Sequence, residues 1–416
     1  MPRWSSVPFT PTYRRVFVVL ILSGVCLETY LLWAHRWDIP KGYADFTIFY
    51  SAANIVRSAQ GKELYNEQIQ YAAQLAAAPD VKIRSWALPY NHPPFEALLF
   101  VPLSYLPYLA SYLAWAALNF GMLFVSIRLL RGHSLPEVSM LTLFAMALMF
   151  FPVFITIFQG QDLLLLLLLV STAYVFVKRG ADFGAGCSLG LGLFRPELAL
   201  PMAMLIAFIR GRRFVTGFLA AALGLILISC AIVGWRGLPG YVEYVWRMER
   251  VHGHGSIIPA EMPNLRGLVS LLFHSKSIQL IITMGTSVVV FAFSLWRIRS
   301  GKVSSSTEHA FCIAVLCTLL VSFHALVHDL ALLVIPIVFV CAEWRESPEE
   351  ISNFRSSSKG LWPVLFFFCT PVLIYLWLGL GRFSLVALVL AAWFWSISTA
   401  RQPISVTSQV SVAGRA

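Results

Sequence analysis

The chain has 416 residues, of which 58% are hydrophobic and 12% are charged, and its formal net charge is +11. The charged fraction is about half of that in a typical soluble domain, so the composition excludes an ordinary water-soluble enzyme or binding module. The positive charge does not indicate nucleic-acid binding, because many of the Lys and Arg residues stand in short clusters between apolar stretches, as in cytoplasmic loops. We therefore expect one integral-membrane domain over residues 1–400 and a cytoplasmic tail over residues 401–416.

The first predicted element is a transmembrane helix over residues 16–34. This stretch is long enough to span a membrane, and no small-residue cleavage site precedes His35, so a retained helix is favoured over a signal peptide. A long extracytoplasmic loop is expected to follow over residues 35–107. Its last part, residues 94–107, is apolar but short and rich in proline, which predicts an interfacial or partly inserted helix.

Apolar stretches long enough to form further membrane helices recur along the rest of the chain. They lie at residues 108–128, 138–157, 163–178, 213–234, 275–296, 309–324, 329–343, 361–379 and 383–400. Residues 183–209 are interrupted at Arg195 and Pro196, which predicts two short helices or a broken hairpin. A second extracytoplasmic loop is expected over residues 235–274. The sequence thus predicts an all-α bundle of about twelve membrane segments.

The basic clusters predict the orientation of this bundle. They stand at Arg14–Arg15, Arg128 and Arg131, Lys178–Arg179, Arg210 with Arg212–Arg213, Arg297 with Arg299 and Lys302, and 345–359. They alternate with connections that lack such clusters, so they are expected on the cytoplasmic side. Counting helices then puts both termini inside. The seven cysteines fall within or at the edge of apolar stretches, with no spacing typical of a metal site or of disulfides.

Asp45 stands shortly after the first predicted helix. A carboxylate at the membrane–water boundary can reach both an aqueous acceptor and the head group of a lipid, and it can take a proton from a hydroxyl. An exposed loop aspartate or a helix cap is the alternative interpretation.

Six short patterns follow one another from this aspartate onward. They are Asp45 with Tyr50 and Ala52, then Gly61 with Leu64 and Tyr65, then Tyr90 with Pro93 and Pro94, then Gly160–Gln161, then Arg195–Pro196, and finally His328–Asp329. In this order the chain resembles the integral-membrane glycosyltransferases of family 87, which have the GT-C architecture and include mannosyl- and arabinofuranosyltransferases. The resemblance covers most of residues 38–345. Two positions depart from the family pattern: Asp162, where a small or amide residue is more frequent, and Arg195, where Lys is common.

The resemblance implies a membrane glycosyltransferase that uses a polyprenyl-phosphate sugar as donor. A mannose or arabinofuranose would move to an envelope glycan or lipid acceptor, outside the bacterial plasma (inner) membrane. Asp45 would be the catalytic general base, and Arg195 the partner of the donor phosphate. Substrate binding would involve Tyr50, Tyr65, His92, Gln161, Arg195, His328 and Asp329. No separate cofactor and no nucleic acid are expected, and membrane lipids are the remaining partners. No metal ligand is assigned; a divalent metal is possible, but no pattern in the sequence supports one.

Several of these residues have a structural alternative. Arg195 could be an arginine that extends from a helix end to the interface, and His92, before two prolines, could only cap a turn. His324, His328 and Asp329 are too few to argue for a metal, which favours hydrogen bonding. His252 and His254 are expected in a flexible acceptor loop.

For the whole chain, a transporter or lipid-linked sugar flippase is the main alternative, although no inverted repeat supports it, and a noncatalytic scaffold is the other.

Overall fold

The computed structural model describes residues 11–78, 87–250, 258–299, 306–346 and 361–399, and all regular elements in these ranges are helices. The all-α prediction is therefore confirmed. The α-helices are α1 (Pro11–Ala34), α2 (Phe46–Arg57), α3 (Glu67–Ala77), α4 (Ala97–Phe100), α5 (Tyr108–Ser134), α6 (Met140–Leu148), α7 (Phe151–Gln159), α8 (Leu163–Lys178), α9 (Asp182–Leu191), α10 (Pro196–Arg210), α11 (Arg212–Val233), α12 (Gly237–Arg250), α13 (Leu265–Leu272), α14 (Lys276–Arg299), α15 (Thr307–Val321), α16 (Val334–Glu346), α18 (Leu361–Phe367), α19 (Thr370–Ile374) and α20 (Val386–Thr399). Shorter helical turns are η2 (Gly61–Glu63), η4 (Pro94–Glu96), η5 (Leu103–Tyr105), η6 (Gly192–Phe194), η7 (Pro259–Glu261), η8 (Val327–Leu333), η11 (Tyr375–Gly379) and η12 (Phe383–Leu385).

Helix is present in every stretch that the sequence predicts to be a membrane segment, but few of these helices could span a membrane alone. Among the described residues, α1, α5, α11 and α14 are long and apolar enough, and the pair α6 and α7, bent by 70°, could form a fifth span. The other apolar helices are shorter, including α8 and α15. The structure confirms several apolar helices, and the count of twelve stays a prediction.

The long helices and the short ones differ in what surrounds them. In the most apolar windows of α1, α11 and α14, only 11% of the residues are buried within the protein, so their apolar side chains face outward, as expected of a lipid-facing surface. Residues 311–320 of α15, all of η8 and residues 334–340 of α16 are buried instead. A helix that is apolar on all sides and buried on all sides belongs in the centre of a bundle.

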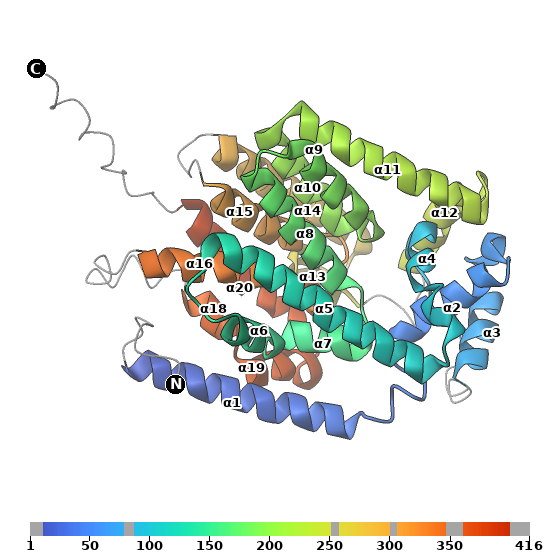
Figure 1. Cartoon of the computed structure of the whole chain (residues 1–416), viewed down its shortest axis with the longest axis horizontal. Coiled ribbons are helices and arrows are strands. Elements are labelled where there is room, and N and C mark those ends of the chain that lie inside the picture. The colour runs from blue at the N-terminus through green and yellow to red at the C-terminus, as the bar shows by residue number, and fades with distance from the viewer. Residues whose placement is uncertain (1–10, 79–86, 251–257, 300–305, 347–360, 400–416) are drawn as a thin grey trace, which may run out of the picture.

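The basic ends of several helices meet at one end of the molecule, called here the basic end. Glu308, in the first turn of α15, accepts hydrogen bonds from Tyr174 at 2.7 Å and from Lys178 at 2.8 Å, both on α8. Arg210 at the end of α10 pairs with Asp182 at the start of α9. Figure 1 shows α2, α3, α4 and α12 gathered at the opposite end, called here the loop end. These helices belong to the two predicted loops, 35–107 and 235–274.

Glycines allow α9 and α11 to pack with their backbones in contact. A Cβ atom placed on Gly186 would come within 2.0 Å of the Phe214 carbonyl oxygen, and one on Gly217 within 2.0 Å of the Phe183 oxygen. Only glycine fits at such a crossing, which is a common way for membrane helices to approach closely. This contact fixes α9, and therefore the start of the break that follows it.

The first predicted loop folds back onto the bundle. Residues 94–107, predicted as one interfacial helix, instead form three short helical turns, η4, α4 and η5, because Pro102 and Pro107 interrupt the helix. Phe100 stacks on Phe49 of α2 with ring centroids 4.7 Å apart and contacts Trp115 of α5. The tail 401–416 and the pair His252 and His254 lie outside the described residues.

Candidate active site

The helix break predicted at Arg195 and Pro196 is present and positions a buried cation. Helix α9 ends at Leu191, the turn η6 follows, and Arg195 leaves the helical conformation with φ −119° and ψ 71° before α10 begins at Pro196. Proline suits the first position of a helix, since the amide hydrogen that it lacks would have no partner there. Arg195 is only 5% exposed, so it does not extend to an interface.

An aspartate that follows α7 balances this buried guanidinium. Nε and Nη2 of Arg195 donate to Oδ1 of Asp162 at 2.9 and 2.6 Å, and Asp162 is fully buried. These two residues are the two departures from the family pattern, and they form one ion pair. Charge-assisted bonds of this length are among the stronger interactions in a protein.

Gln161 connects the ion pair to Asp45. Its Oε1 accepts from Nη2 of Arg195 at 2.5 Å, and its Nε2 donates to Oδ2 of Asp45 at 2.7 Å. Both ends of the amide are used, so its orientation is fixed by its partners. Gln161 is thus placed to orient Asp45.

The backbone around Gln161 is held by α5. Gly160 ends α7 in the left-handed region with φ +67°, and a Cβ there would lie 2.7 Å from Cβ of Phe46. Nε1 of Trp115 donates to the Gly160 carbonyl at 3.0 Å, and Nδ2 of Asn119 donates to the Gln161 carbonyl at 3.3 Å. Side-chain donors thereby satisfy carbonyls at the end of α7 that have no helical partner.

Asp45 does not act as a helix cap. It directly precedes α2, yet its side chain makes no capping hydrogen bond there and turns instead to Gln161. Its other oxygen, Oδ1, forms no hydrogen bond with any residue that the structure describes. This half-buried carboxylate is therefore held by one oxygen and leaves the second for another molecule.

His92 and Glu96 form the next wall of the site. Nδ1 of His92 lies 2.8 Å from Oε2 of Glu96, and the Glu96 side chain is completely buried. The Tyr65 hydroxyl donates to the His92 carbonyl at 2.8 Å and positions that loop. Glu96 is missing from the site residues predicted from the sequence, although an acidic residue within the apolar stretch 94–107, four positions after His92, is a signal for it.

The connection between α15 and α16 brings in His324, His328 and Asp329. Oδ2 of Asp329 accepts from the Leu326 amide at 2.7 Å, which closes the turn, and Oδ1 lies 3.6 Å from Nε2 of His328. The Thr156 hydroxyl of α7 donates to the His328 carbonyl at 3.3 Å and joins this turn to the end of α7. His328 is in electrostatic contact with Arg195, Asp45 and Asp162.

Tyr50 lies apart from these groups. Its hydroxyl donates to the Leu106 carbonyl at 2.8 Å, and its ring packs on Tyr108, so it anchors α2 to the end of the first loop. The structure thus brings Asp45, His92, Gln161, Arg195, His328 and Asp329 together. Tyr65 is linked to this group by its hydrogen bond to the His92 carbonyl, and Tyr50 does not belong to the group.

Buried polar atoms without hydrogen-bond partners are concentrated here. They include both oxygens of Glu96, Nε2 of His328, Nδ1 of His324 and Oδ1 of Asp329. A buried polar atom that lacks a partner is costly, so such a group in a native protein calls for a functional explanation. In the described residues these atoms keep the capacity to form hydrogen bonds with a polar or charged ligand.

The local charges shift the pKa values of the loop residues. Burial and then the positive charge of Arg195 lower the pKa of His92 to about 3 and of His328 to about 3. Burial raises the pKa of Glu96 well above its usual value, and the charge of Asp162 adds to this effect. Burial alone would raise the pKa of Asp162, but the adjacent Arg195 outweighs it and lowers this pKa to about 2. The histidines are therefore neutral near pH 7.

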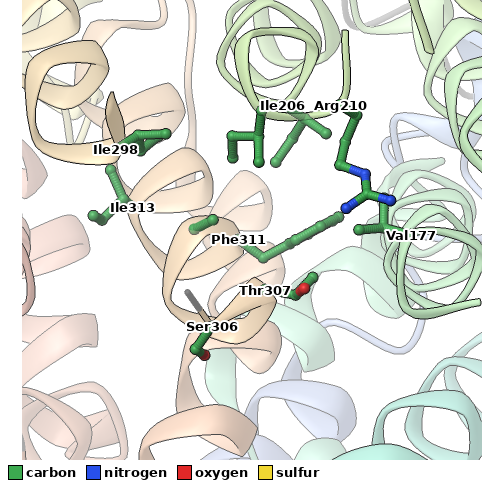
Figure 2. A pocket seen from close by; sticks show the side chains of 10 residues that line it. Val177, Ile206, Arg210, Ile298, Ser306, Thr307, Phe311 and Ile313 are labelled. Atoms are coloured by element: carbon green, nitrogen blue, oxygen red, sulfur yellow. The ribbon is translucent and has the colours of Figure 1, made fainter. Parts of the chain in front are cut away.

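A cavity of about 130 Å³ lies at the basic end, and unlike the candidate site it is lined mainly by apolar side chains. It is lined by apolar side chains of α8, α10, α14 and α15, including Val177, Ile206 and Phe311, and Figure 2 shows Arg210 reaching into it from α10. Because Arg210 already pairs with Asp182 at 2.7 Å, this cavity offers little for polar catalysis. Asp162 and Arg195, which belong to the candidate site, lie at the opposite ends of α8 and α10.

The comparisons with known proteins give one finding. The model of glycosyltransferase family 87 matches residues 90–327, which is more than half of the chain. The matched range contains His92, Glu96, Gln161, Asp162 and Arg195, and it ends just before His328. Neither the curated proteins nor the solved structures contain a match to the chain.

Proposed function

Because this chain belongs to glycosyltransferase family 87, and is accordingly a membrane glycosyltransferase, we propose that it transfers a sugar from a polyprenyl-phosphate donor at the site around Asp45 and Arg195. The sugar is of the mannose or arabinofuranose class, and the acceptor is an envelope glycan or lipid. The observation that carries the proposal is the chain of contacts from Asp45 through Gln161 to Arg195, at 2.7 and 2.5 Å. It joins a carboxylate that can take a proton to a cation that can hold a phosphate.

Asp45 is the general base in this proposal. A hydroxyl of the acceptor attacks the anomeric carbon of the donor sugar, and its proton passes to Oδ1 of Asp45 as the new glycosidic bond forms. The bond between the anomeric carbon and the phosphate oxygen breaks, and its electron pair leaves with the polyprenyl phosphate. Gln161 holds Oδ2 of Asp45 and so keeps Oδ1 free for the acceptor.

Arg195 receives the negative charge that develops on the leaving phosphate. Its Nε and Nη2 bind Asp162 and Gln161, whereas Nη1 forms no hydrogen bond within the described part of the chain. Nη1 can therefore donate to a phosphate oxygen. The amino end of the 15-residue helix α10 lies at the same place and adds its positive dipole end.

His328, Asp329 and His92 complete the substrate-binding surface in this proposal. The neutral imidazoles can donate or accept hydrogen bonds, and the free oxygen of Asp329 can accept one from a sugar hydroxyl. Sugars carry many hydroxyls, and buried polar atoms without partners discriminate strongly in favour of a ligand that supplies them. Tyr65 stays a predicted substrate-binding residue through its support of His92.

The experiment that tests the function is a transfer assay with the purified chain. Polyprenyl-phosphate mannose and polyprenyl-phosphate arabinofuranose, each with radiolabelled sugar, are incubated with envelope glycolipid acceptors, and the products are separated. Transfer from one of the two donors supports the proposal. If neither donor is consumed with any acceptor while the folded protein remains intact, the proposed donor class is wrong.

The orientation of the site is tested separately. The proposal puts the loop end outside the plasma membrane and the basic end in the cytoplasm, as the basic clusters require. A cysteine at exposed Gln60, between α2 and η2, should react with an impermeant thiol reagent in intact cells, and one at Gly180, between α8 and α9, should react only after lysis. The reverse pattern would place the site on the cytoplasmic side.

A further inference from the structure

Three side chains at the edge of the site are arranged as ligands of a metal ion. One ligand atom each from His92, Glu96 and Asp162 lies within 4.8 Å of the other two, and all three residues are buried. They come from two segments of the chain, since His92 precedes η4, Glu96 is the last residue of η4, and Asp162 precedes α8. The arrangement therefore depends on the fold and is not a local acidic run.

Glu96 supplies an independent reason to expect a ligand. Its side chain is completely buried, and within the described residues neither oxygen accepts a hydrogen bond from a donor, since the group beside it is a second carboxyl, that of Asp162. Nδ1 of His92 lies 2.8 Å from its Oε2, although the pair does not form a hydrogen bond of acceptable geometry. Two ligands at right angles around an ion, each about 2.1 Å from it, are about 3 Å apart. The pair needs to separate only slightly to bind one ion together.

Asp162 can serve Arg195 and an ion at the same time. A carboxylate has about four lone-pair positions, and Arg195 uses those that face α10. The ligand oxygens of Asp162 and Glu96 lie within 4.8 Å of each other, and two ionised carboxyl groups this close together repel one another. A cation between the two carboxylates would turn this repulsion into attraction.

The excess of carboxyl groups over basic groups at the site also favours a bound cation. Arg195 is in electrostatic contact with Asp162, Glu197 and Asp329, and Glu96 in turn with Asp162 and Glu197. Four carboxyl groups thus surround one guanidinium, with Asp45 as a fifth carboxyl beyond Gln161. A polyprenyl-phosphate donor would bring further negative charge to this place. This part of the reasoning rests on the proposed function, whereas the geometry of the three ligands does not.

We infer that His92, Glu96 and Asp162 bind one divalent cation next to Arg195. A neutral imidazole with two carboxylates suits Mn²⁺ better than Mg²⁺, which prefers oxygen ligands alone. The bound ion neutralises the excess carboxylates and gives the donor phosphate a second positive charge beside the guanidinium. It adds a metal to a site for which the sequence assigns no metal ligand. The competing account is that a proton on Glu96, shared with Asp162, holds the two carboxyl groups together.

Direct binding of Mn²⁺ to the full-length chain in detergent tests the inference without any donor or acceptor. The purification tag is removed, and free Mn²⁺ is measured by its electron paramagnetic resonance signal as protein is added. One ion per chain should bind, and the electron spin-echo modulation should show one coordinated imidazole nitrogen. Glu96→Gln keeps the size of the side chain and should weaken binding roughly tenfold or more. His92→Gln should remove the nitrogen modulation.

Glu63→Gln is the matched control, because Glu63 is an exposed glutamate of the same loop and should bind no ion at this site. Its affinity for Mn²⁺ should equal that of the parent chain. The inference is overturned if the folded parent chain binds no Mn²⁺ at millimolar concentration, or if Glu96→Gln binds it as tightly as the parent. It is also overturned if the bound ion shows no imidazole nitrogen. Failure of sugar transfer would refute the proposed function and leave this binding result unchanged.

Discussion

Helix α10 has an Arg–Asp pair at each end. The two pairs have the same chemistry, but they differ in burial and in the groups that they contact. At its start, Arg195 and Asp162 lie 2.6 Å apart with side chains that are 6% and 0% exposed. At its end, Arg210 and Asp182 lie 2.7 Å apart, with 27% and 17% exposed. The first pair contacts Gln161 and, through it, Asp45. The second borders an apolar cavity (Figure 2).

The difference shows how a function can be assigned to one of two similar pairs. Burial of a charge is costly, and an ion pair in the interior often contributes little net stability. The pair at the loop end is therefore poorly explained by stability alone, whereas the pair at the basic end suits a helix connection near the membrane surface. Unpaired atoms of Glu96, His328 and Asp329 accompany the first pair.

The largest expected effect is on the rate of sugar transfer. It is tested by replacing one aspartate at each end of the molecule. Asp45→Asn keeps the shape of the side chain and removes the basic oxygen, so the rate of transfer should fall by roughly 10²- to 10⁴-fold. Asp182→Asn, at the basic end, should transfer sugar at nearly the parent rate. Initial rates at saturating donor measure both. Near-normal turnover of Asp45→Asn would show that it is not the base.

The two arginines give the next contrast. Arg195→Gln leaves Asp162 buried without a partner, which should destabilise the fold by about 3–5 kcal/mol and raise the KM for the donor. Arg210→Gln should cost about 1 kcal/mol or less and leave the KM unchanged. Arg195→Lys keeps the charge but loses the two-pronged geometry, so it should be partly active. Thermal unfolding and donor titrations measure these effects.

A double variant separates folding from donor binding. Arg195→Gln combined with Asp162→Asn removes both charges of the pair and should recover part of the lost stability, since Asp162 is no longer a buried charge without its partner. Its KM for the donor should stay high, because no guanidinium faces the phosphate. A double variant with the parent KM would remove Arg195 from the phosphate site.

A smaller effect is expected at Gln161, which positions Asp45. Gln161→Met has a similar size and loses the hydrogen bonds to Asp45 and Arg195, each of which involves a charged group. We expect a decrease of about 10- to 100-fold in kcat with little change in the acceptor KM. Gln159→Met, two positions earlier, is the control and should be near normal. Equal kcat values for the two variants would contradict the positioning role.

The smallest expected effect concerns the pH dependence of stability at His328. Burial lowers its pKa to about 3 in the folded protein, from 6.5 for an unburied histidine. The unfolded chain therefore binds a proton below pH 6.5 that the folded chain does not. Relative to His328→Gln, the parent should lose up to about 1.4 kcal/mol per pH unit between pH 6 and 4.

Thermal unfolding of both proteins across this range measures the difference. Between pH 7 and 8 the gap should be constant, because the histidine is neutral in both states. A gap that stays constant down to pH 4 would show that His328 is charged, or freely hydrated, in the folded protein.

Much of the fold follows from the order of apolar stretches. Each predicted stretch contains helix, and the break at Arg195 and Pro196 is where the sequence predicts it, because proline and a buried charge both interrupt an apolar helix. The number of true spans could not be settled this way. The bent pair α6 and α7 and the largely buried α15 satisfy the same hydropathy pattern as lipid-facing helices.

The site was predictable to the extent that its residues stand out against an apolar background. Asp45, Gln161, Arg195 and His328 are conspicuous for that reason, and the structure brings them together. Their pairing was not predictable, since Asp162 and Arg195 are 33 residues apart and no periodicity links them. In the sequence their departures from the family pattern are two separate features, whereas in the structure they form one contact.

An experimental structure of the chain with a polyprenyl-phosphate sugar, obtained in the absence of acceptor, tests the central claim most directly. The account predicts that the phosphate lies at the start of α10, within hydrogen-bond distance of Nη1 of Arg195, with the anomeric carbon facing Asp45. A donor head group bound at the basic end, beside Arg210, would contradict it.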